Sequence, residues 1–129
     1  MIDADVIIKG EKGAFDLLGW IAAQSQELEV AAITVAELWH GVERATIPHR
    51  ARRESFIRTL LDGVLVVPYT QATAFEHARI WAAAEASGKT IGPYDCIVAA
   101  SALERGNTLA TFNRRYFEHV DRLKVIEPK

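Results

Sequence analysis

Three acidic residues stand where their carboxylates could bind a metal ion together. Asp3, Glu37 and Asp95 each follow an apolar run or begin a helical one, in the segments MIDADVII, VAAITVAELWHGV and IGPYDCIVAASALERG. In a parallel α/β sheet the carboxyl ends of the strands form one edge, and ligands bind in the crevice beyond that edge. The three acids are therefore predicted to gather at one site there.

Carboxylates gathered in this way predict a divalent metal ion and hydrolytic chemistry. Two carboxylates about 4 Å apart repel by about 4 kcal/mol at an effective dielectric constant near 20, unless a cation lies between them. Hard oxygen ligands select Mg²⁺, or Mn²⁺ in its place, over Zn²⁺. Water bound to such an ion loses a proton more easily, and the ion can neutralise charge that develops on a phosphoryl oxygen. The predicted reaction is phosphodiester hydrolysis.

Each acid taken alone also has a purely structural explanation. Thr34 and Glu37 fit a capping box, and Asp95 lies in an expected first helical turn, where the helix dipole favours a negative charge by roughly half a kcal/mol. Asp3 and Asp5 suit a turn. The metal site is preferred because all three acids follow strand or loop signals at the same edge, which independent caps need not do.

The elements that must position these acids alternate along the chain. Apolar runs predict strands at residues 1–3, 29–33, 64–67, 108–111 and 124–126. Helical spacing, prolines and glycines predict helices at residues 14–25, from 34 past 42, 48–61, 70–87 and 93–106. Alternating strands and helices predict an α/β fold with a parallel sheet covered on both faces.

Length and composition fit a single domain over residues 1–129. The chain is 50% hydrophobic and 25% charged, which is ordinary globular usage. At this size a core can form without disulfides or a structural metal, so a bound metal is expected to be functional. With the lone Cys96, no charged-then-apolar leader and no apolar run of about eighteen residues, the protein is expected to be cytoplasmic and to make no membrane contact.

The net charge of −2 argues against a protein that coats nucleic acid by phosphate contacts alone, but it does not exclude a nuclease. Basic residues crowd one segment that includes Arg52 and Arg53, which we interpret as a solvated helix face. Arg114 and Arg115 follow the strand expected at 108–111, so they are better candidates for contacting a phosphate beside the acidic edge.

Four motifs, in order, resemble the PIN domain and, within it, the VapC-type toxin ribonucleases of bacterial VapBC toxin-antitoxin systems. Asp3-Ala4-Asp5-Val6-Ile7-Ile8 resembles the family's D-x-N-V-L-I, and Ala36-Glu37-Leu38-Trp39-His40-Gly41 its A-E-L-x-x-G. Residues 91–102, IGPYDCIVAASA, resemble I-G-P-x-D-x-x-I-A-A-x-A, and residues 109–117, LATFNRRYF, resemble L-v-T-x-N-x-x-x-F. The resemblance spans nearly the whole chain.

The resemblance implies a fold, an activity and partners. Family members have a three-layer α/β/α arrangement with a five-stranded parallel sheet in order 3-2-1-4-5, cleave RNA, and commonly form homodimers. A VapB-type antitoxin silences them and can place a basic residue at the acidic pocket. Carried onto this chain, Asp3, Glu37 and Asp95 hold Mg²⁺ directly or through water, Asn113 completes the pocket, and Thr111 orients a ligand or water. The RNA substrate would be tRNA, rRNA or another structured RNA.

The chain departs from the family pattern at three places. Asn113 stands where many relatives have Asp, so one metal ion is expected rather than two. Asp5 replaces the usual Asn or Ser and adds an acid that either lies behind the metal ligands or tightens metal binding. Only Met1 and Ile2 precede Asp3, whereas strands usually run about five residues. The N-terminal segment is therefore expected to fray.

Two alternatives remain open. Asp3-Ala4-Asp5-Val6 also fits the opening motif of haloacid-dehalogenase-type phosphatases, but Lys89 is the only lysine near Asp95 and the expected late acidic pair is missing. A non-catalytic PIN-like module would bind RNA or a partner chain, although carboxylates that repel phosphate do not help it.

Other residues that could do chemistry are given structural roles. The four histidines have no zinc-ligand spacing, and Cys96 is expected to be a buried thiol. Trp20, Trp39 and Trp81 lie in helical apolar patterns, so we expect core or dimer contacts rather than base stacking.

Overall fold

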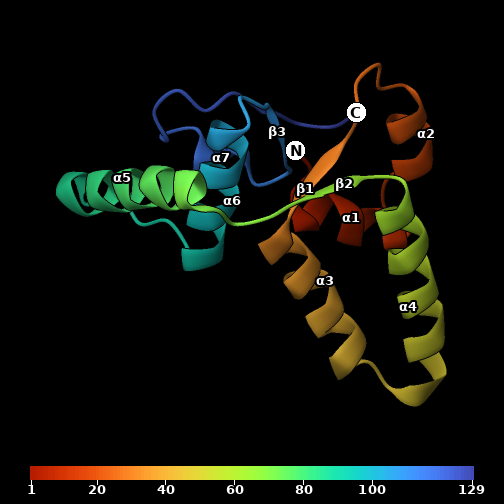
Figure 1. Ribbon diagram of the computed structural model, residues 1–129. Coiled ribbons are helices and arrows are strands. Elements are labelled where there is room, and N and C mark those ends of the chain that lie inside the picture. The colour runs from red at the N-terminus through yellow and green to blue at the C-terminus, as the bar shows by residue number, and fades with distance from the viewer.

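Short parallel strands form the middle of the molecule (Figure 1). The computed structural model describes all residues 1–129. Strand β1 (Glu29–Ala31) pairs in parallel with β2 (Leu65–Val67), and β3 (Leu109–Ala110) pairs in parallel with β4 (Val125–Ile126). The two pairs are separate two-stranded sheets. The chain is thus of the α/β class, as predicted.

The N-terminal segment lies between the two sheets. The N–H of Ile2 donates to the carbonyl of Glu29 at 2.8 Å, and the N–H of Ala110 donates to the carbonyl of Met1 at 2.8 Å. Ile2 and Ala110 form an isolated parallel bridge. Because this segment and its neighbours pair over so few residues, they do not form one continuous ladder, and the five-stranded order 3-2-1-4-5 is not confirmed.

The expected fraying of the N-terminal segment is wrong for this structure. The Met1 ammonium group donates to the carbonyl of Thr108 at 2.8 Å, and both Met1 and Ile2 are buried. Two residues are enough because each reaches a neighbouring strand through the backbone and packs its side chain into the core. Asp3 therefore starts from an anchored segment.

Seven helices surround the strands. They are α1 (Ala4–Glu11), α2 (Leu17–Ala22), α3 (Ala32–Arg44), α4 (Ile47–Asp62), α5 (Gln71–Ser87), α6 (Pro93–Glu104) and α7 (Arg114–Phe117). The helix predicted at 14–25 corresponds to the shorter α2, and α1 is a correction, because it occupies residues where only a turn was predicted. Asp3 caps α1 by accepting from the N–H of Ala4, and Asp16 caps α2 by accepting from the N–H of Gly19. The short helix α7 was not predicted.

Helix α3 begins earlier than the sequence suggested. Its N-cap is Ala31, the last residue of β1, and no side chain caps it. Thr34 is buried inside the helix, so the predicted capping box of Thr34 and Glu37 is wrong. The strand passes into the helix without a loop, and this moves Glu37 out of the first turn and frees its carboxylate for another role.

Several predicted helix ends are confirmed. Thr70 caps α5 in a capping box with Thr73, and α5 ends at Gly88, whose φ of 70° is left-handed. Pro93 is the first residue of α6, where its missing N–H costs no hydrogen bond. These local signals act within one turn of helix, which explains why sequence predicts them well.

Two hydrophobic cores lie on opposite sides of the strands. One contains Met1 and Ala31 with residues of α5 and α6, and the other contains Ile2 and Val30 with residues of α1 to α4. Neighbouring residues of an extended segment point to opposite faces, so Met1 and Ile2 divide between the two cores. Figure 1 accordingly shows α5, α6 and α7 on one side of the strands and α1 to α4 on the other. None of the helices has both the length and the apolar composition to cross a membrane.

Candidate active site

Helices that begin close to the strands carry the four acids of the candidate site. Asp3 is the N-cap of α1, Asp5 lies in the first turn of α1, and Asp95 lies in the first turn of α6. Glu37 lies on α3, which packs against both α1 and α6. The fold therefore brings together segments that are about ninety positions apart in the chain.

Asp3 and Asp5 are tied together by Thr111. The hydroxyl of Thr111, which is completely buried, donates to Oδ2 of Asp3 at 2.8 Å and lies 3.3 Å from Oδ1 of Asp5. Asp3 is itself only 4% exposed, and its Oδ1 accepts from the N–H of Ala4 at 2.9 Å. Thr111 was predicted to orient a ligand or a water; in the structure its hydroxyl orients the carboxylates of Asp3 and Asp5.

The turn after β3 completes this network through its backbone. The N–H of Phe112 donates to Oδ2 of Asp5 at 2.9 Å, and the N–H of Asn113 donates to Oγ1 of Thr111 at 3.0 Å. Asn113 is exposed and is the N-cap of α7. Asn113 therefore joins the acidic network by its main chain, and its side chain forms no hydrogen bond to the acids.

The pKa of Asp3 shows how strongly the pocket opposes negative charge. Burial, and then the charge of Asp5, raise the pKa of Asp3 from its ordinary 3.8 to about 7. The hydrogen bonds from Thr111 and Ala4 oppose this rise, and the charge of Asp95 adds to it. Without a cation, the pocket therefore favours the protonated form of Asp3 far more than water does.

The other three acids share this behaviour. Burial is the largest cause that raises the pKa of Asp5, Glu37 and Asp95. The charge of Asp95, followed by that of Asp5, raises the pKa of Glu37, and the charge of Asp5 raises the pKa of Asp95. Asp5 therefore acts on all three other acids, so the four form one electrostatic cluster. The three acids singled out by the sequence therefore lie in one region of the folded molecule.

The donor set fits a hard divalent cation that keeps part of its water shell. No three His, Cys, Asp or Glu side chains stand close enough to form a ready-made metal cage. Oε1 of Glu37, however, is buried and has no hydrogen-bond partner, and the pKa of each of the four carboxylates is raised. Mg²⁺ commonly binds to one or two carboxylates and several waters, so the residues suit such an ion.

Backbone lies close to Asp95. A Cβ atom on Gly92, the N-cap of α6, would stand 3.2 Å from Oδ2 of Asp95. Such a contact is tighter than side chains normally tolerate, so glycine at this position leaves room for the carboxylate to turn. The I-G-P-Y-D motif therefore has a steric reason for its glycine.

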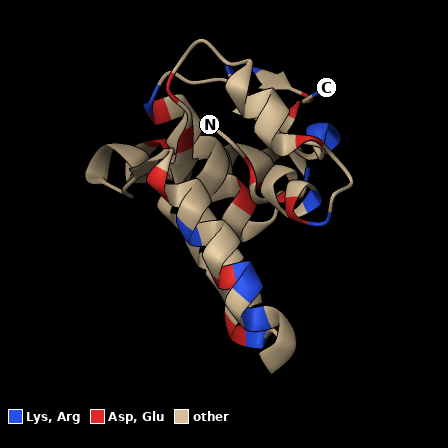
Figure 2. Cartoon of the chain, turned by 90° about the vertical axis from the view of Figure 1, so that its right-hand side faces the viewer, with Lys and Arg blue, Asp and Glu red and all other residues tan.

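The basic residues divide into paired and free ones. Arg50 and Arg58 pair with Glu43 and Glu54 at 3.0 and 3.2 Å, and Figure 2 shows the blue and red bands interleaved on this helical hairpin. The interpretation of Arg53 as part of a solvated helix face is wrong. Its side chain donates to Glu11 at 2.8 Å and to the carbonyl of Gly41 at 3.1 Å.

Arg114 and Arg115 are exposed in α7, directly after Asn113. The guanidinium of Arg115 stands over the ring of Tyr116 at 5.3 Å, and neither arginine pairs with an acid of the cluster. The structure thus leaves both arginines free at the border of the site.

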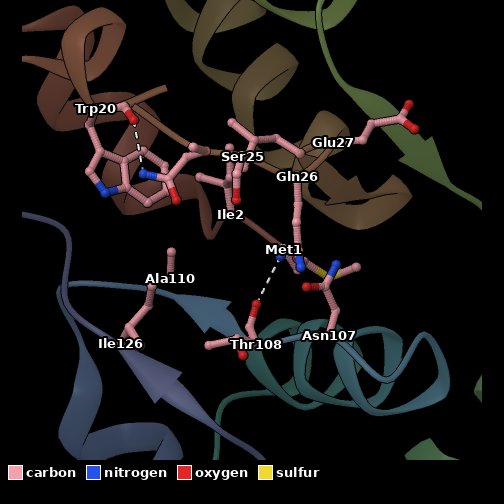
Figure 3. A pocket seen from close by; sticks show the side chains of 12 residues that line it. Met1, Ile2, Trp20, Ser25, Gln26, Glu27, Asn107, Thr108, Ala110 and Ile126 are labelled. Atoms are coloured by element: carbon pink, nitrogen blue, oxygen red, sulfur yellow. Dashed lines mark hydrogen bonds between the residues drawn. The ribbon is translucent and has the colours of Figure 1, made fainter. Parts of the chain in front are cut away.

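A separate cavity of about 250 Å³ opens at the other end of the strands (Figure 3). Glu27 and Leu28 precede β1, Asn107 and Thr108 precede β3, and the Met1 ammonium points to Thr108. None of the candidate site residues lines it. The acids occupy the carboxyl edge of the strands, which is where ligands bind in open α/β sheets.

The sequence left two roles open for Asp5, behind the metal ligands or in metal binding. The structure adds that its charge acts on all three of the other acids. The available signal was its position in the first turn of a helix that begins right after Asp3. That helix was missed, and the position of Asp5 was missed with it.

Known proteins resemble this chain over nearly its full length. Residues 1–123 match the family model of the PIN domain. The "VapC ribonuclease Y4jK" of Sinorhizobium fredii is 36% identical over 99% of this chain and 96% of the relative, and a "tRNA(fMet)-specific endonuclease VapC" of Shigella flexneri is 30% identical over 74% and 71%. The crystal structure of VapBC2 from Rickettsia felis has a TM-score of 0.92 at 19% identity, covering 100% of this chain and 98% of that one.

Proposed function

Because this chain belongs to the PIN domain family, we propose that it is a VapC-type toxin, a metal-dependent endoribonuclease whose acidic pocket holds Mg²⁺. The observation that carries the proposal is the cluster of four carboxylates with raised pKa at the carboxyl edge of the strands. Such a cluster is unfavourable without a cation, and a protein rarely maintains one unless it is used.

Asp3, Glu37 and Asp95 would hold the ion, and Mn²⁺ could replace Mg²⁺. When bound, the ion makes a water molecule more acidic and neutralises charge on a phosphoryl oxygen. Asp95 or Glu37 accepts the proton of the attacking water. The bond from phosphorus to the 3′-oxygen then breaks and the departing oxygen takes up a proton from solvent water, which leaves a 5′-phosphate and a 3′-hydroxyl. Thr111 and Asp5 keep Asp3 in place, and the neutral Asn113 favours one ion over two.

The proposed substrate is tRNA, or rRNA or another structured RNA. The Shigella flexneri relative is named a tRNA(fMet)-specific endonuclease, which makes tRNA the first class to test. The reaction does not use the 2′-hydroxyl as a nucleophile, so a preference for RNA has to come from shape and contacts. Arg114 and Arg115 are free to contact phosphates beside the cleaved bond.

The decisive experiment is cleavage of total RNA by wild type and Asp95→Asn, with and without Mg²⁺ or Mn²⁺. We expect metal-dependent cleavage by wild type and a loss of at least 100-fold in the variant, since proton transfer and metal binding each contribute about 100-fold or more. Asp62→Asn, an exposed acid at the end of α4, is the matched control and should cleave normally. Equal cleavage by all three proteins would refute the mechanism, and sequencing the fragments would identify the RNA.

The two alternatives give different results in the same assays. A haloacid-dehalogenase-type phosphatase would hydrolyse a small phosphate monoester, and membership of the PIN family argues against it. A non-catalytic module would bind RNA or a partner without cleaving it. Neither needs four carboxylates that raise one another's pKa.

We further propose a VapB-type antitoxin as the partner. An apolar groove of about 320 Å³ lies between α2 and α4, with Leu18, Phe56 and Leu60 among its lining residues. Leu18 is 71% exposed, so a partner's apolar side chains could cover it, while a basic side chain reaching the acidic pocket would compete with the metal. Leu18→Asp should weaken co-purification with the antitoxin, whereas Ile47→Asp, at a residue 89% exposed outside this groove, should not. Equal retention of the antitoxin by both variants would reject this surface.

Four broader features complete the proposal. Residues 1–129 form a single PIN-like domain, and the N-terminal segment takes the central place in a sheet of order 3-2-1-4-5. The backbone hydrogen bonds of Ile2 to Glu29 and of Ala110 to Met1 support that order. The protein acts in the cytoplasm as a homodimer.

A further inference from the structure

An aromatic cavity adjoins the proposed catalytic acid. It has a volume of about 360 Å³ and lies between α5 and the start of α6, with His77, Trp81, Tyr94 and Ile97 in its wall. Tyr94 and Cys96, which both line it, flank Asp95 in the chain. One helical turn therefore carries both the wall of this cavity and the carboxylate.

The rings of His77 and Trp81 form a ready-made stacking surface. Their spacing of four residues places them on the same face of α5, and they stack with centroids 5.9 Å apart and planes 23° apart. The hydroxyl of Tyr69 lies 2.8 Å from Nδ1 of His77, and the Tyr69 ring meets the imidazole edge-on. This contact fixes the His77 ring, which in turn supports Trp81.

Trp81 and Tyr94 are unusually open for large aromatic residues. Trp81 is 59% exposed and Tyr94 is 56% exposed, so the expected place of Trp81 in the core is wrong, whereas the expected dimer contact stays a prediction. Trp20 and Trp39, by contrast, pack against the core. Exposed rings that border a cavity can receive a flat apolar ligand without first being uncovered.

The chemistry of the cavity selects the kind of ligand. No lysine or arginine lines it, so it offers nothing that would neutralise a phosphate. Aromatic and aliphatic side chains instead suit the face of a nucleobase, which stacks on aromatic rings in many single-stranded RNA complexes. Phosphates of the same strand could lie at the adjoining acidic pocket and at Arg114 and Arg115.

We propose that the cavity of His77, Trp81 and Tyr94 is a nucleobase-binding subsite that holds an unpaired base of the RNA next to the cleaved phosphate. The inference rests on the proposed ribonuclease function and adds a specificity determinant to it. Tyr94 and Asp95 share the first turn of α6, so an RNA strand that leaves the cavity around this turn would bring the neighbouring phosphodiester to Asp95. RNA loops with unstacked bases would be preferred over paired stems.

Binding is tested first, with short single-stranded oligoribonucleotides of adenosine or uridine and matched abasic oligonucleotides. Tryptophan fluorescence is followed in the Asp95→Asn background, so that cleavage does not interfere. We expect quenching by the oligonucleotides with bases and little by the abasic ones. Tyr94→Ala, which removes part of the cavity wall but keeps Trp81 as the reporter, should weaken the quenching, and Phe75→Ala should not, since Phe75 is 68% exposed on the same helix as Trp81 but lines no part of this cavity. Equal quenching by abasic oligonucleotides would overturn the proposal.

Cleavage by otherwise wild-type protein is tested second. Trp81→Ala should lower kcat/KM by about 10- to 100-fold, in line with the usual contribution of one stacked base, and Trp81→Phe should restore most of it. Normal cleavage by Trp81→Ala would refute the subsite and leave the ribonuclease function intact. Base-dependent quenching without any cleavage by wild type would refute the function and leave the subsite. A change from dimer to monomer in Trp81→Ala, measured by light scattering, would overturn the proposal in favour of a protein interface.

Discussion

At the scale of single residues, the site is organised around Thr111 and Asp5. One buried hydroxyl joins two carboxylates, and the charge of Asp5 acts on Asp3, Glu37 and Asp95. The pocket thereby stores electrostatic repulsion that a cation can relieve. The repulsion lowers the stability of the metal-free folded protein and strengthens the binding of a cation. Such arrangements are common in active sites.

The raised pKa of Asp3 predicts a pH-dependent stability. The folded pKa of about 7 exceeds the ordinary 3.8, so the folded protein binds more protons than the unfolded chain between these values. The stabilising contribution is complete below about pH 4 and is lost as the pH rises through 7. Urea unfolding of the metal-free protein should show a decrease attributable to Asp3 on the order of 2–4 kcal/mol across this window.

The matched comparison isolates Asp3 from other titrating groups. Asp3→Asn should lose much of this decrease, whereas Asp62→Asn should follow wild type. Mg²⁺ added at pH 8 should stabilise wild type and have a smaller effect on Asp3→Asn, because the carboxylate that the ion needs is gone. If wild type and Asp3→Asn kept the same pH profile, the burial of Asp3 charge would not control stability.

Two substitutions at Thr111 distinguish the contribution of its hydroxyl to stability from that of its shape. Thr111→Val keeps the volume but removes the donor to Asp3 and the acceptor for the N–H of Asn113. We expect the free energy of unfolding at pH 8 to fall by about 1–3 kcal/mol, the usual cost of leaving buried polar groups unpaired. Thr111→Ser retains the hydroxyl and should lose less. Equal stability of the two variants in urea unfolding would show that this hydrogen bond contributes little.

At the scale of elements, one side chain connects three helices. Arg53 of α4 donates to Glu11 at the end of α1 and to the backbone carbonyl of Gly41 in α3. The side chains of Arg53 and Glu11 are 34% and 19% exposed, so this pair is better shielded than the Arg50 and Arg58 pairs. The α3–α4 hairpin is thereby tied to the helix that carries Asp3 and Asp5.

Removing this connection should lower stability measurably. Arg53→Ala is expected to reduce the free energy of unfolding by about 1–2 kcal/mol, because a charged hydrogen bond to a half-buried carboxylate is lost together with a backbone contact. Arg52→Ala is the matched control: Arg52 is exposed and lies only near His49, so its loss should stay within about 0.5 kcal/mol. Thermal unfolding of both variants would test this, and equal losses would contradict the bridging role of Arg53.

At the scale of the whole molecule, the strands join two cores rather than enclosing one. Met1 and Ala31 belong to the core beneath α5 and α6, and Ile2 and Val30 belong to the core beneath α1 to α4. If these segments left one core, they would also leave the other and expose its apolar side chains to water. The acidic site lies where the two halves meet, since Asp3 and Glu37 come from one side and Asp95 from the other.

This shared middle layer predicts cooperative unfolding. In Trp81→Phe the remaining fluorescence comes from Trp20 and Trp39, which pack against one core, whereas circular dichroism reports helices on both sides. The two signals should give one urea transition with the same midpoint, as expected for a small two-state domain. Two separated midpoints would mean that the halves unfold independently.

Local order was readable from the sequence because its causes act within a few residues. The helix over 70–87, its end at Gly88 and the position of Pro93 at the start of the next helix were all predicted, and so was the approximate place of every strand. The identity of the acids was also readable, since their motifs are short and contiguous. Thr34 shows the limit, because a capping pattern loses to a helix that begins directly at the end of β1.

Only the tertiary structure decided how far charge is buried and which groups meet. The hydrogen bond of Thr111 to Asp3 joins residues 108 positions apart, and the desolvation that raises the pKa of Asp3 depends on every element packed around it. The influence of Asp5 on the other acids and the exposure of Trp81 were out of reach for the same reason: spacing along the chain gives a helix face, but burial and charge depend on distances in space, which are set when the two cores close around the strands.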